Sequence, residues 1–197
     1  MIAIESKRRK RENILKKYPD AVIADVTSQA TDGLVKLSPF YPHGGIPVPF
    51  SEGYTAMCVE GVWQGLKVFE SADVDVNMFA NGTMKNIKRT VKRFGKPLGH
   101  RKGVNGTELL GYIEARKQIY LTADKWVIEY KGAKIIERLR EACKTKTIVL
   151  LDYTTNCDID NPKTPLSHAF LIKAYAEGLY PRRQENTDRS AANAVAI

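Results

Sequence analysis

The sequence predicts a single α+β domain, α/β-like in character, that is mostly helical and packed around a small central β-sheet. A chain of 197 residues with 43% hydrophobic residues is long enough to bury a core of its own. Several segments repeat apolar residues every three or four positions, as amphipathic helices do, while residues 21–26 and 147–153 are short apolar runs typical of buried strands. We assign the domain to residues 1–180 and expect residues 181–197, charged and then rich in alanine, to be disordered.

The chain begins with a stretch, residues 5–18, that predicts a helix ended by Pro19. Its basic block, residues 7–11, suits either contacts with phosphates or an ordinary solvent-exposed helical face. The strand at residues 21–26 and a polar turn follow. Residues 34–37 then form a candidate second strand that leads into the next loop.

A turn-rich segment, LSPFYPHGGIPVPFSEGYTA at residues 37–56, approaches the centre of the chain. Between residues 41 and 51 it holds three prolines and two glycines, so it cannot be a regular helix. We expect an ordered loop or a short hairpin that folds over a pocket. Phe40 and Tyr41, just before it, can stack on a base or ribose; alternatively one is core and one surface, with Phe40 in the core.

The central segment, CVEGVWQGLKVF at residues 58–69, has a helical period with one apolar stripe. Glu60, Gln64 and Lys67 are spaced four and three apart, so on a helix they form a second line close to Trp63. A carboxylate, an amide and an ammonium group beside an indole make a usable wall for a polar pocket. The same residue types also occur on solvated helix surfaces.

These two stretches together resemble the opening signature of the NADAR family. The family pattern is roughly LSNFYP, a hairpin-like loop, then EH, two residues that often include an aromatic, Q, two residues and K. Pro39 stands here for the usual Asn and Gly61 for the usual His, so contacts made by those two side chains are not carried over. The matching positions are Leu37, Ser38, Phe40, Tyr41, Pro42, Glu60, Trp63, Gln64 and Lys67.

The resemblance implies an N-glycosidase that needs no metal or other cofactor. Its substrate class is a nucleotide-derived or ADP-ribosylated ribose, such as ADP-ribosyl-guanosine or a ribosylamino-pyrimidine phosphate. Glu60 is then the key carboxylate, which stabilises positive charge on the ribose and takes a proton from water. Lys67 is the second catalytic residue, or binds phosphate or the leaving group. The residues assigned to substrate binding are Ser38, Phe40, Tyr41, Trp63 and Gln64.

The segment after the central helix is basic. Residues 84–94 predict an amphipathic helix with Lys and Arg on its outer side, stopped by Gly95. An irregular glycine-rich loop, residues 96–106, follows and carries GHR at residues 99–101. In NADAR proteins a GR pair follows a comparable helix, so GHR resembles that element with one residue inserted. We therefore expect the Arg101 guanidinium to bind an anionic group of the substrate.

The clearest strand, residues 147–153, ends in the polar run DYTTN. Polar residues at the end of a buried strand often face a ligand cleft, so Asp152, Tyr153 and Asn156 are further candidates for substrate contact. A capped turn without a ligand explains the same residues equally well. Helices are predicted over residues 108–120, 133–142 and 164–178, and residues 126–130 fit either an extended segment or a short helix.

Charge and cysteine usage limit the partners and the compartment. Lys and Arg exceed Asp and Glu by 31 to 22, which gives a net charge of +9 and favours a nucleotide, a phosphorylated metabolite or nucleic acid. The three cysteines are far apart and include no CxxC pair, so we expect free thiols in a reducing compartment. No apolar run has membrane-spanning length and no secretory signal is recognisable, so we expect a cytoplasmic protein without a membrane partner.

Two other functions fit the same sequence. A basic protein can hold nucleotide or nucleic acid without turnover, through residues 7–11 and 85–102. An inactive relative of NADAR enzymes can act as an antitoxin or as a sensor of ADP-ribose compounds.

Overall fold

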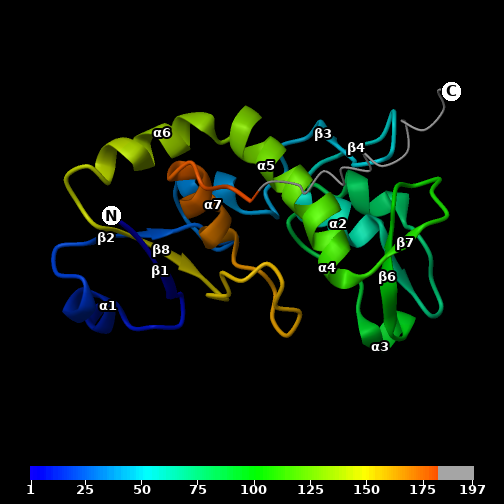
Figure 1. Ribbon diagram of the computed structural model, residues 1–197, viewed down its shortest axis with the longest axis horizontal. Helices are drawn as coiled ribbons and strands as arrows, with labels where there is room; N and C mark the ends of the chain where they lie inside the picture. Colours follow the sequence, from blue (N-terminus) through cyan, green and yellow to red (C-terminus); the bar gives the residue numbers. More distant parts are fainter. Residues whose placement is uncertain (182–197) are drawn as a thin grey trace, which may run out of the picture.

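Three small β-sheets connected by helices make up residues 1–181, the part of the chain that the computed structural model describes. This confirms the predicted α+β class, although the strands divide among several small sheets. Figure 1 shows the two three-stranded sheets in opposite halves of an elongated molecule. The expected tail, residues 181–197, lies outside the described residues apart from its first residue.

The parallel sheet has the strand order β1-β8-β2, with β8 in the centre. Alternate residues of β8 face opposite layers. Val149 packs with Ile14 of α1, whereas Ile148 and Leu150 pack with α6 and α7 on the other face. This two-sided burial explains why β8 is the most uniformly apolar strand. The elements are β1 (Ile2–Ser6), α1 (Arg11–Lys17), β2 (Val22–Asp25), α6 (Ala133–Ala142), β8 (Ile148–Asp152) and α7 (His168–Ala176).

The other half of the molecule surrounds helix α2. An antiparallel sheet of order β5-β6-β7 and the short β3–β4 hairpin lie beside it, and η2 packs closely against it. A Cβ atom on Gly65 would lie 2.2 Å from the Phe79 ring, so only glycine lets η2 approach α2 this closely. The elements are β3 (Ile46–Pro47), β4 (Thr55–Ala56), α2 (Val59–Gly65), β5 (Lys67–Phe69), η2 (Val76–Ala80), α3 (Val91–Phe94), β6 (Pro97–Arg101) and β7 (Leu109–Leu110).

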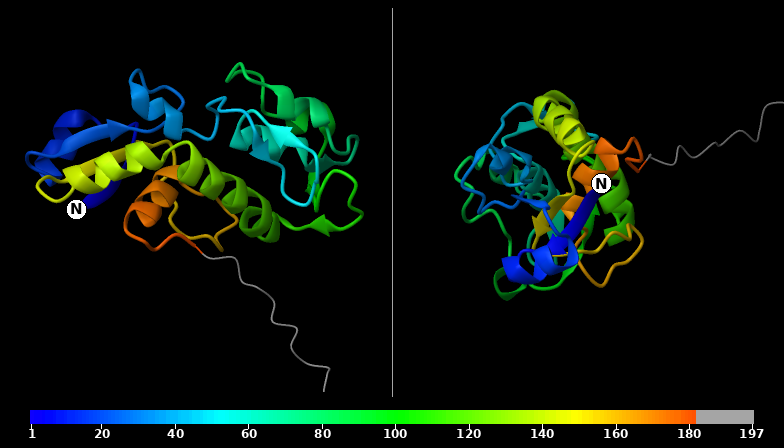
Figure 2. Two further views of the ribbon diagram at one scale, coloured as in Figure 1. Left: turned by 90° about the horizontal axis from the view of Figure 1, so that it is seen from above. Right: turned by 90° about the vertical axis from the view of Figure 1, so that its left-hand side faces the viewer.

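A helical run links the two halves. It comprises α4 (Tyr112–Ala115), the π-helical turn η3 (Arg116–Tyr120) and α5 (Leu121–Tyr130). Val127 of α5 belongs to the core around α2, whereas its neighbour Ile128 belongs to the core around the parallel sheet. The views of Figure 2 show α4, α5 and α6 following one another along the molecule.

Several predicted boundaries in the first half of the chain are wrong. The predicted helix over residues 5–18 begins only at Arg11, because Ile2–Ser6 pairs with β8. Residues 34–37 lie in a 3₁₀ helix, η1 (Gly33–Leu37), that the Asp32 side chain caps by accepting from the Leu34 amide. The central helix ends at Gly65 because Lys67–Phe69 pairs with β6.

The second half has similar corrections. Most of the predicted basic helix at residues 84–94 is irregular, since Met84 and Asn86 have φ angles of 59° and 55°, outside the helical region. The predicted loop contains β6, and the predicted helix at residues 108–120 starts as β7. Residues 126–130 belong to α5, and Ser167 caps α7 three residues after the expected start. Residues 133–142 are helical as predicted.

A buried ion pair fastens α7 to the parallel sheet. The His168 Nδ1 lies 3.0 Å from the Asp152 Oδ2 at the end of β8, and its Nε2 lies 2.6 Å from the Val26 carbonyl oxygen. Both neighbours are acceptors, so the imidazole holds two protons and is charged. Burial alone would lower the pKa of His168, but the hydrogen bond and charge of Asp152 outweigh burial and raise it.

Changing His168 to Leu should lower the free energy of unfolding by about 3–5 kcal/mol at pH 6, because it leaves Asp152 buried without its cation. Because the pKa of His168 is higher in the folded than in the unfolded chain, protonation of His168 stabilises the fold. This stabilisation is complete below the ordinary pKa of 6.5 and is lost as the pH rises through the pKa of the folded state. The difference between parent and variant should therefore shrink from pH 6 to pH 9. Urea unfolding at both pH values measures it, and an unchanged difference would show that His168 is neutral.

Candidate functional site

The first turn of α2 is fixed to the loop that precedes it. The Glu60 amide donates to the Pro39 carbonyl at 2.9 Å, and the Cys58 Sγ caps the helix by accepting from the Gly61 amide at 3.2 Å. A Cβ atom on Gly61 would lie 2.8 Å from the Met78 carbonyl oxygen. This contact explains why position 61 holds glycine.

Glu60 is the centre of the candidate site. Its side chain is buried, with 8% of the residue exposed, and the Gln64 Nε2 donates to its Oε1 at 2.9 Å. Within residues 1–181 the second carboxylate oxygen, Oε2, accepts no hydrogen bond. Of the predicted line on one helical face, Glu60 and Gln64 are present and face inward, whereas Lys67 lies beyond the end of the helix, on β5.

Arg89 holds the other end of the Gln64 amide. Its backbone N–H donates to the Gln64 Oε1 at 3.0 Å, which turns the Gln64 NH₂ group towards Glu60. The buried guanidinium donates to the carbonyls of Gln64, Lys67 and Asp73. The central carbon of this guanidinium, Cζ, lies 5.0 Å from the ring centroids of both Phe69 and Phe94.

Two lysines lie within electrostatic range of Glu60 without forming an ion pair with it. They are Lys67 at the start of β5, which is partly buried, and the exposed Lys88. Burial raises the pKa of Glu60, and the Gln64 hydrogen bond and the two ammonium groups only partly oppose this. Burial also lowers the pKa of Lys67, against the attraction of Glu60. Both groups are thus shifted towards neutrality.

Trp63 lies at the edge of this group, partly buried and enclosed by other rings. Its ring centroid is 3.7 Å from that of His100 on β6, and the rings of Tyr112 and Tyr120 meet it edge-on at 5.8 Å. His100 is 2% exposed. Neither of its ring nitrogens has a well-formed hydrogen bond within the described chain, although the Trp63 carbonyl lies nearby. Burial and the Lys67 charge lower the pKa of His100 to about 3, so it is a neutral stacking partner.

The SPFYP loop, joined to α2 by the Pro39–Glu60 hydrogen bond, carries two aromatic residues directly after Pro39. Ser38 is buried and its Oγ accepts from the Phe40 amide at 3.3 Å. Phe40 is only partly buried, contrary to the expectation of a core residue, and the Lys88 ammonium lies 5.8 Å from its ring centroid. Tyr41 is also partly buried, and its ring contacts that of His43, with centroids 4.8 Å apart and a tilt of 55°, and not that of Trp63.

The Arg101 guanidinium already forms hydrogen bonds within the protein. Its Nε and Nη2 donate to the two carboxylate oxygens of Asp73 at 3.1 and 2.8 Å, and its Nη1 donates to the Thr107 carbonyl at 2.9 Å. To bind an anionic substrate as predicted, Arg101 would have to leave Asp73. The hydrogen bonds to Arg101 hold the pKa of Asp73 below its usual value, so this acid stays charged.

Asp152 and Asn156 serve the turn after β8. Besides His168, the Asp152 carboxylate accepts from the Ser167 hydroxyl at 2.7 Å and from two backbone amides. The Asn156 amide donates to the Thr164 carbonyl at 3.1 Å and accepts from the Asp158 N–H at 3.0 Å. These contacts match the capped-turn interpretation, and the structure does not bring either residue into contact with Glu60. Tyr153 is exposed.

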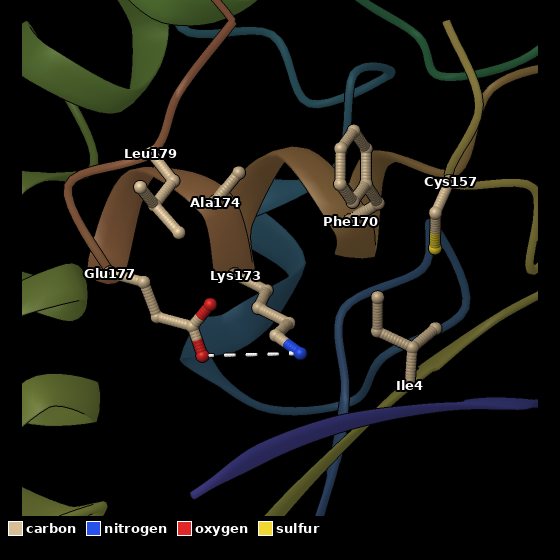
Figure 3. A pocket seen from close by; sticks show the side chains of 7 residues that line it. All are labelled: Ile4, Cys157, Phe170, Lys173, Ala174, Glu177 and Leu179. Carbon is tan, nitrogen blue, oxygen red and sulfur yellow. Dashed lines mark ion pairs between the residues drawn. The ribbon is translucent and has the colours of Figure 1, made fainter.

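Two surface hollows lie away from Glu60. One, of about 630 Å³, is formed by residues 47–55. The other, of about 260 Å³, lies beside α7 and has a mainly apolar lining. Lys173 and Glu177, whose charged groups are 3.9 Å apart, form an ion pair at its edge (Figure 3). In residues 1–181 no three His, Cys, Asp or Glu side chains converge as metal ligands do. No helix in the same range is long and apolar enough to cross a membrane.

Arg89, Lys88 and His100 belong to this site but were not predicted from the sequence. Arg89 and Lys88 were placed on the outer side of a helix that does not form, whereas the chain turns Arg89 inward. His100 lies in the GHR run, which the structure places on strand β6. On a strand, successive side chains point to opposite faces, so His100 points inward and Arg101 outward. This orientation cannot be predicted unless the strand is known.

Comparison with known proteins identifies one family. A family model described as a family of unknown function (DUF6939) matches residues 6–172. No curated protein and no solved structure matches the chain.

Changing Glu60 to Gln should raise the melting temperature at pH 8 and leave it almost unchanged at pH 4. The pKa of Glu60 is higher in the folded chain than its ordinary value of 4.5, so ionisation of Glu60 destabilises the fold. This loss of stability grows as the pH rises from 4.5 through the pKa of the folded state. Each kcal/mol relieved raises the melting temperature by about 2–4 °C. Thermal melts at both pH values measure this. The exposed Glu137, which has no ion pair in residues 1–181, gives the control Glu137→Gln.

The three histidines should titrate in separate ranges. With a pKa of about 3, His100 should show no NMR shift change between pH 5 and 8. His43, whose pKa is lowered by burial, should titrate below 6.5, and His168 above 6.5. Single His→Gln variants assign the signals. A midpoint near 6.5 for His100 would mean that its ring is hydrated and not stacked on Trp63.

Proposed function

Because the chain belongs to a family of unknown function, we propose an activity from its site: it is an N-glycosidase that hydrolyses the bond between a base-like nitrogen and the anomeric carbon of a ribose. The substrate is nucleotide-derived or ADP-ribosylated. The observation that carries this proposal is the buried Glu60 carboxylate, held by Gln64 at one oxygen and free at the other. The resemblance of residues 37–67 to the NADAR signature supports the same activity.

The chemistry needs a carboxylate in this state. As the bond from the anomeric carbon to nitrogen breaks, positive charge builds on the ribose, and a carboxylate in a weakly hydrated place stabilises it more strongly than one in water. The oxygen of water bonds to the anomeric carbon as the bond to nitrogen breaks, and the Glu60 Oε2 accepts the proton released. The departing nitrogen takes up a proton from the solvent, and Glu60 then returns its own proton to the solvent. A raised pKa brings Glu60 closer to the operating pH of a general base.

Lys67 and Lys88 supply the positive charge for a phosphate. Neither ammonium group forms an ion pair with an acidic side chain of the described chain, while the Arg101 guanidinium is engaged by Asp73. We therefore assign phosphate binding to the lysines in preference to Arg101. Phe40, beneath the Lys88 ammonium, is the ring best placed to contact a base next to that phosphate.

A second candidate function is binding of nucleotide or nucleic acid without turnover. It is favoured by the basic segment from Lys85 to Lys96, where no Lys or Arg side chain forms an ion pair with another described residue. Binding of this kind would weaken steeply as salt rises, because it depends on the release of counterions.

Changing Glu60 to Gln should lower the rate of base release by roughly 10²–10⁴-fold, since the amide keeps the shape and cannot accept the proton. Purified parent and variant are incubated with ADP-ribosyl-guanosine and a ribosylamino-pyrimidine phosphate, and the free base is measured by mass spectrometry. Glu137→Gln on the exposed side of α6 is the matched control and should keep the parental rate.

Equal rates for the parent and the Glu60→Gln variant would remove the catalytic assignment. If the parent releases no base from any N-ribosyl compound but binds an oligonucleotide with a strong salt dependence, the binding function replaces the enzymatic one.

A further inference from the structure

A π-helical turn interrupts the helical run that faces the site. The turn, Arg116–Tyr120, lies between α4 and α5 and packs against α2. π-helical turns are rare and are often found at functional sites. The extra residue rotates the rest of the helix by about 100° relative to a regular α-helix. The last side chain of this turn is Tyr120.

A specific set of contacts keeps the turn in place. The Arg116 guanidinium is buried and donates to the carbonyls of Ile159, Asn161 and Thr164 at 2.7, 2.9 and 3.1 Å. The loop before α7 therefore holds the turn in place. Tyr120, four residues after Arg116, packs both with the core around α2 and with Leu166 and Leu171.

Tyr120 contacts Trp63, the indole at the edge of the candidate site. The two rings meet edge-on, with centroids 5.8 Å apart and an interplanar angle of 85°, and Trp63 lies one helical turn after Glu60. No side chain or backbone group in residues 1–181 forms a hydrogen bond with the Tyr120 hydroxyl. Tyr120 is only partly buried and its hydroxyl is not sealed inside the core, so a ligand at Trp63 can reach it.

The surroundings keep this phenol neutral. Burial, followed by the charges of Asp124, Glu60 and Asp152, raises the pKa of Tyr120 well above its ordinary value of 10. A neutral phenol can both donate and accept one hydrogen bond, as a sugar hydroxyl requires. It cannot act as a base at neutral pH.

We propose that the Tyr120 hydroxyl binds the 2′-hydroxyl of the ribose and so makes the site selective for ribosyl over 2′-deoxyribosyl substrates. This inference rests on the proposed function, in which Glu60 acts at the adjacent anomeric carbon. Hydrogen bonds to the 2-hydroxyl strengthen as a glycosidic bond breaks, so Tyr120 contributes to the rate as well as to binding. The substrate class is thereby narrowed to compounds that retain this hydroxyl.

The test compares Tyr120→Phe with the parent on a ribosyl substrate and its 2′-deoxy analogue. Phenylalanine keeps the edge contact with Trp63 and removes only the oxygen. The parent should prefer the ribosyl form by roughly 10- to 100-fold in kcat/KM, as expected for one hydrogen bond in a desolvated site. In the Tyr120→Phe variant, kcat/KM should fall by that factor for the ribosyl substrate and stay unchanged for the 2′-deoxy analogue.

Tyr112→Phe is the matched control, because Tyr112 also meets Trp63 edge-on at 5.8 Å but is 39% exposed. It should keep the parental preference. Equal losses of Tyr120→Phe on both substrates would indicate a structural role, and no loss would place Tyr120 outside the site; either result overturns the inference.

A binding measurement separates this inference from the proposed function. If the parent hydrolyses neither substrate, the proposed function fails. Quenching of tryptophan fluorescence by ribose 5-phosphate and by 2-deoxyribose 5-phosphate, in a Trp126→Phe background, then decides the matter. A preference for ribose 5-phosphate that disappears in Tyr120→Phe supports the inference, and equal binding of both sugars by the parent overturns it.

Discussion

The hydrogen bond between Glu60 and Gln64 is the interaction on which the site depends. A buried carboxylate is unfavourable unless it is paired, and this one has a single amide donor and no adjacent cation within the described chain. The amide in turn is oriented by Arg89, whose guanidinium joins three backbone carbonyls around α2 and β5. The fold thus uses a buried arginine and a glutamine to hold one incompletely satisfied acid, which is characteristic of functional sites.

The helix that carries Glu60 packs in one of the two cores, and the helical run beside it connects that core to the other. The run from α4 to α5 contributes Val127 to one core and Ile128 to the other, and its π-helical turn presents Tyr120 to α2. Close packing around α2 depends on Gly65, which leaves no space for a side chain against the Phe79 ring. A displacement in the packing around α2 would therefore be transmitted to Glu60, because close-packed interiors transmit strain.

Local patterns in the sequence predicted the parts of the fold that depend on local spacing. The helical period of residues 59–64 correctly placed Glu60 next to Gln64, and the apolar run at residues 148–152 correctly predicted the central strand. Pairings between distant segments leave no such local pattern: Ile2–Ser6 is a strand because β8, about 145 residues later in the chain, accepts it as a partner. The burial of Arg89 likewise cannot be predicted from the local sequence, because the irregular backbone before it changes which side chains face inward.

The arrangement of charges favours a substrate with two distinct ends over a simple polyanion. A polyanion would satisfy Lys67 and Lys88 but would bring further negative charge towards Glu60, whose ionisation burial already opposes. In the function we propose, a ribosyl nucleotide would place its phosphate at the lysines and its anomeric carbon, which becomes cationic in the transition state, at the carboxylate. Each of the three charged groups then gains a partner of opposite sign during the reaction. In that proposal the partner of Glu60 develops fully only as the glycosidic bond breaks, so this interaction would favour the transition state more than the bound substrate. This is the reason we propose catalysis in preference to simple binding.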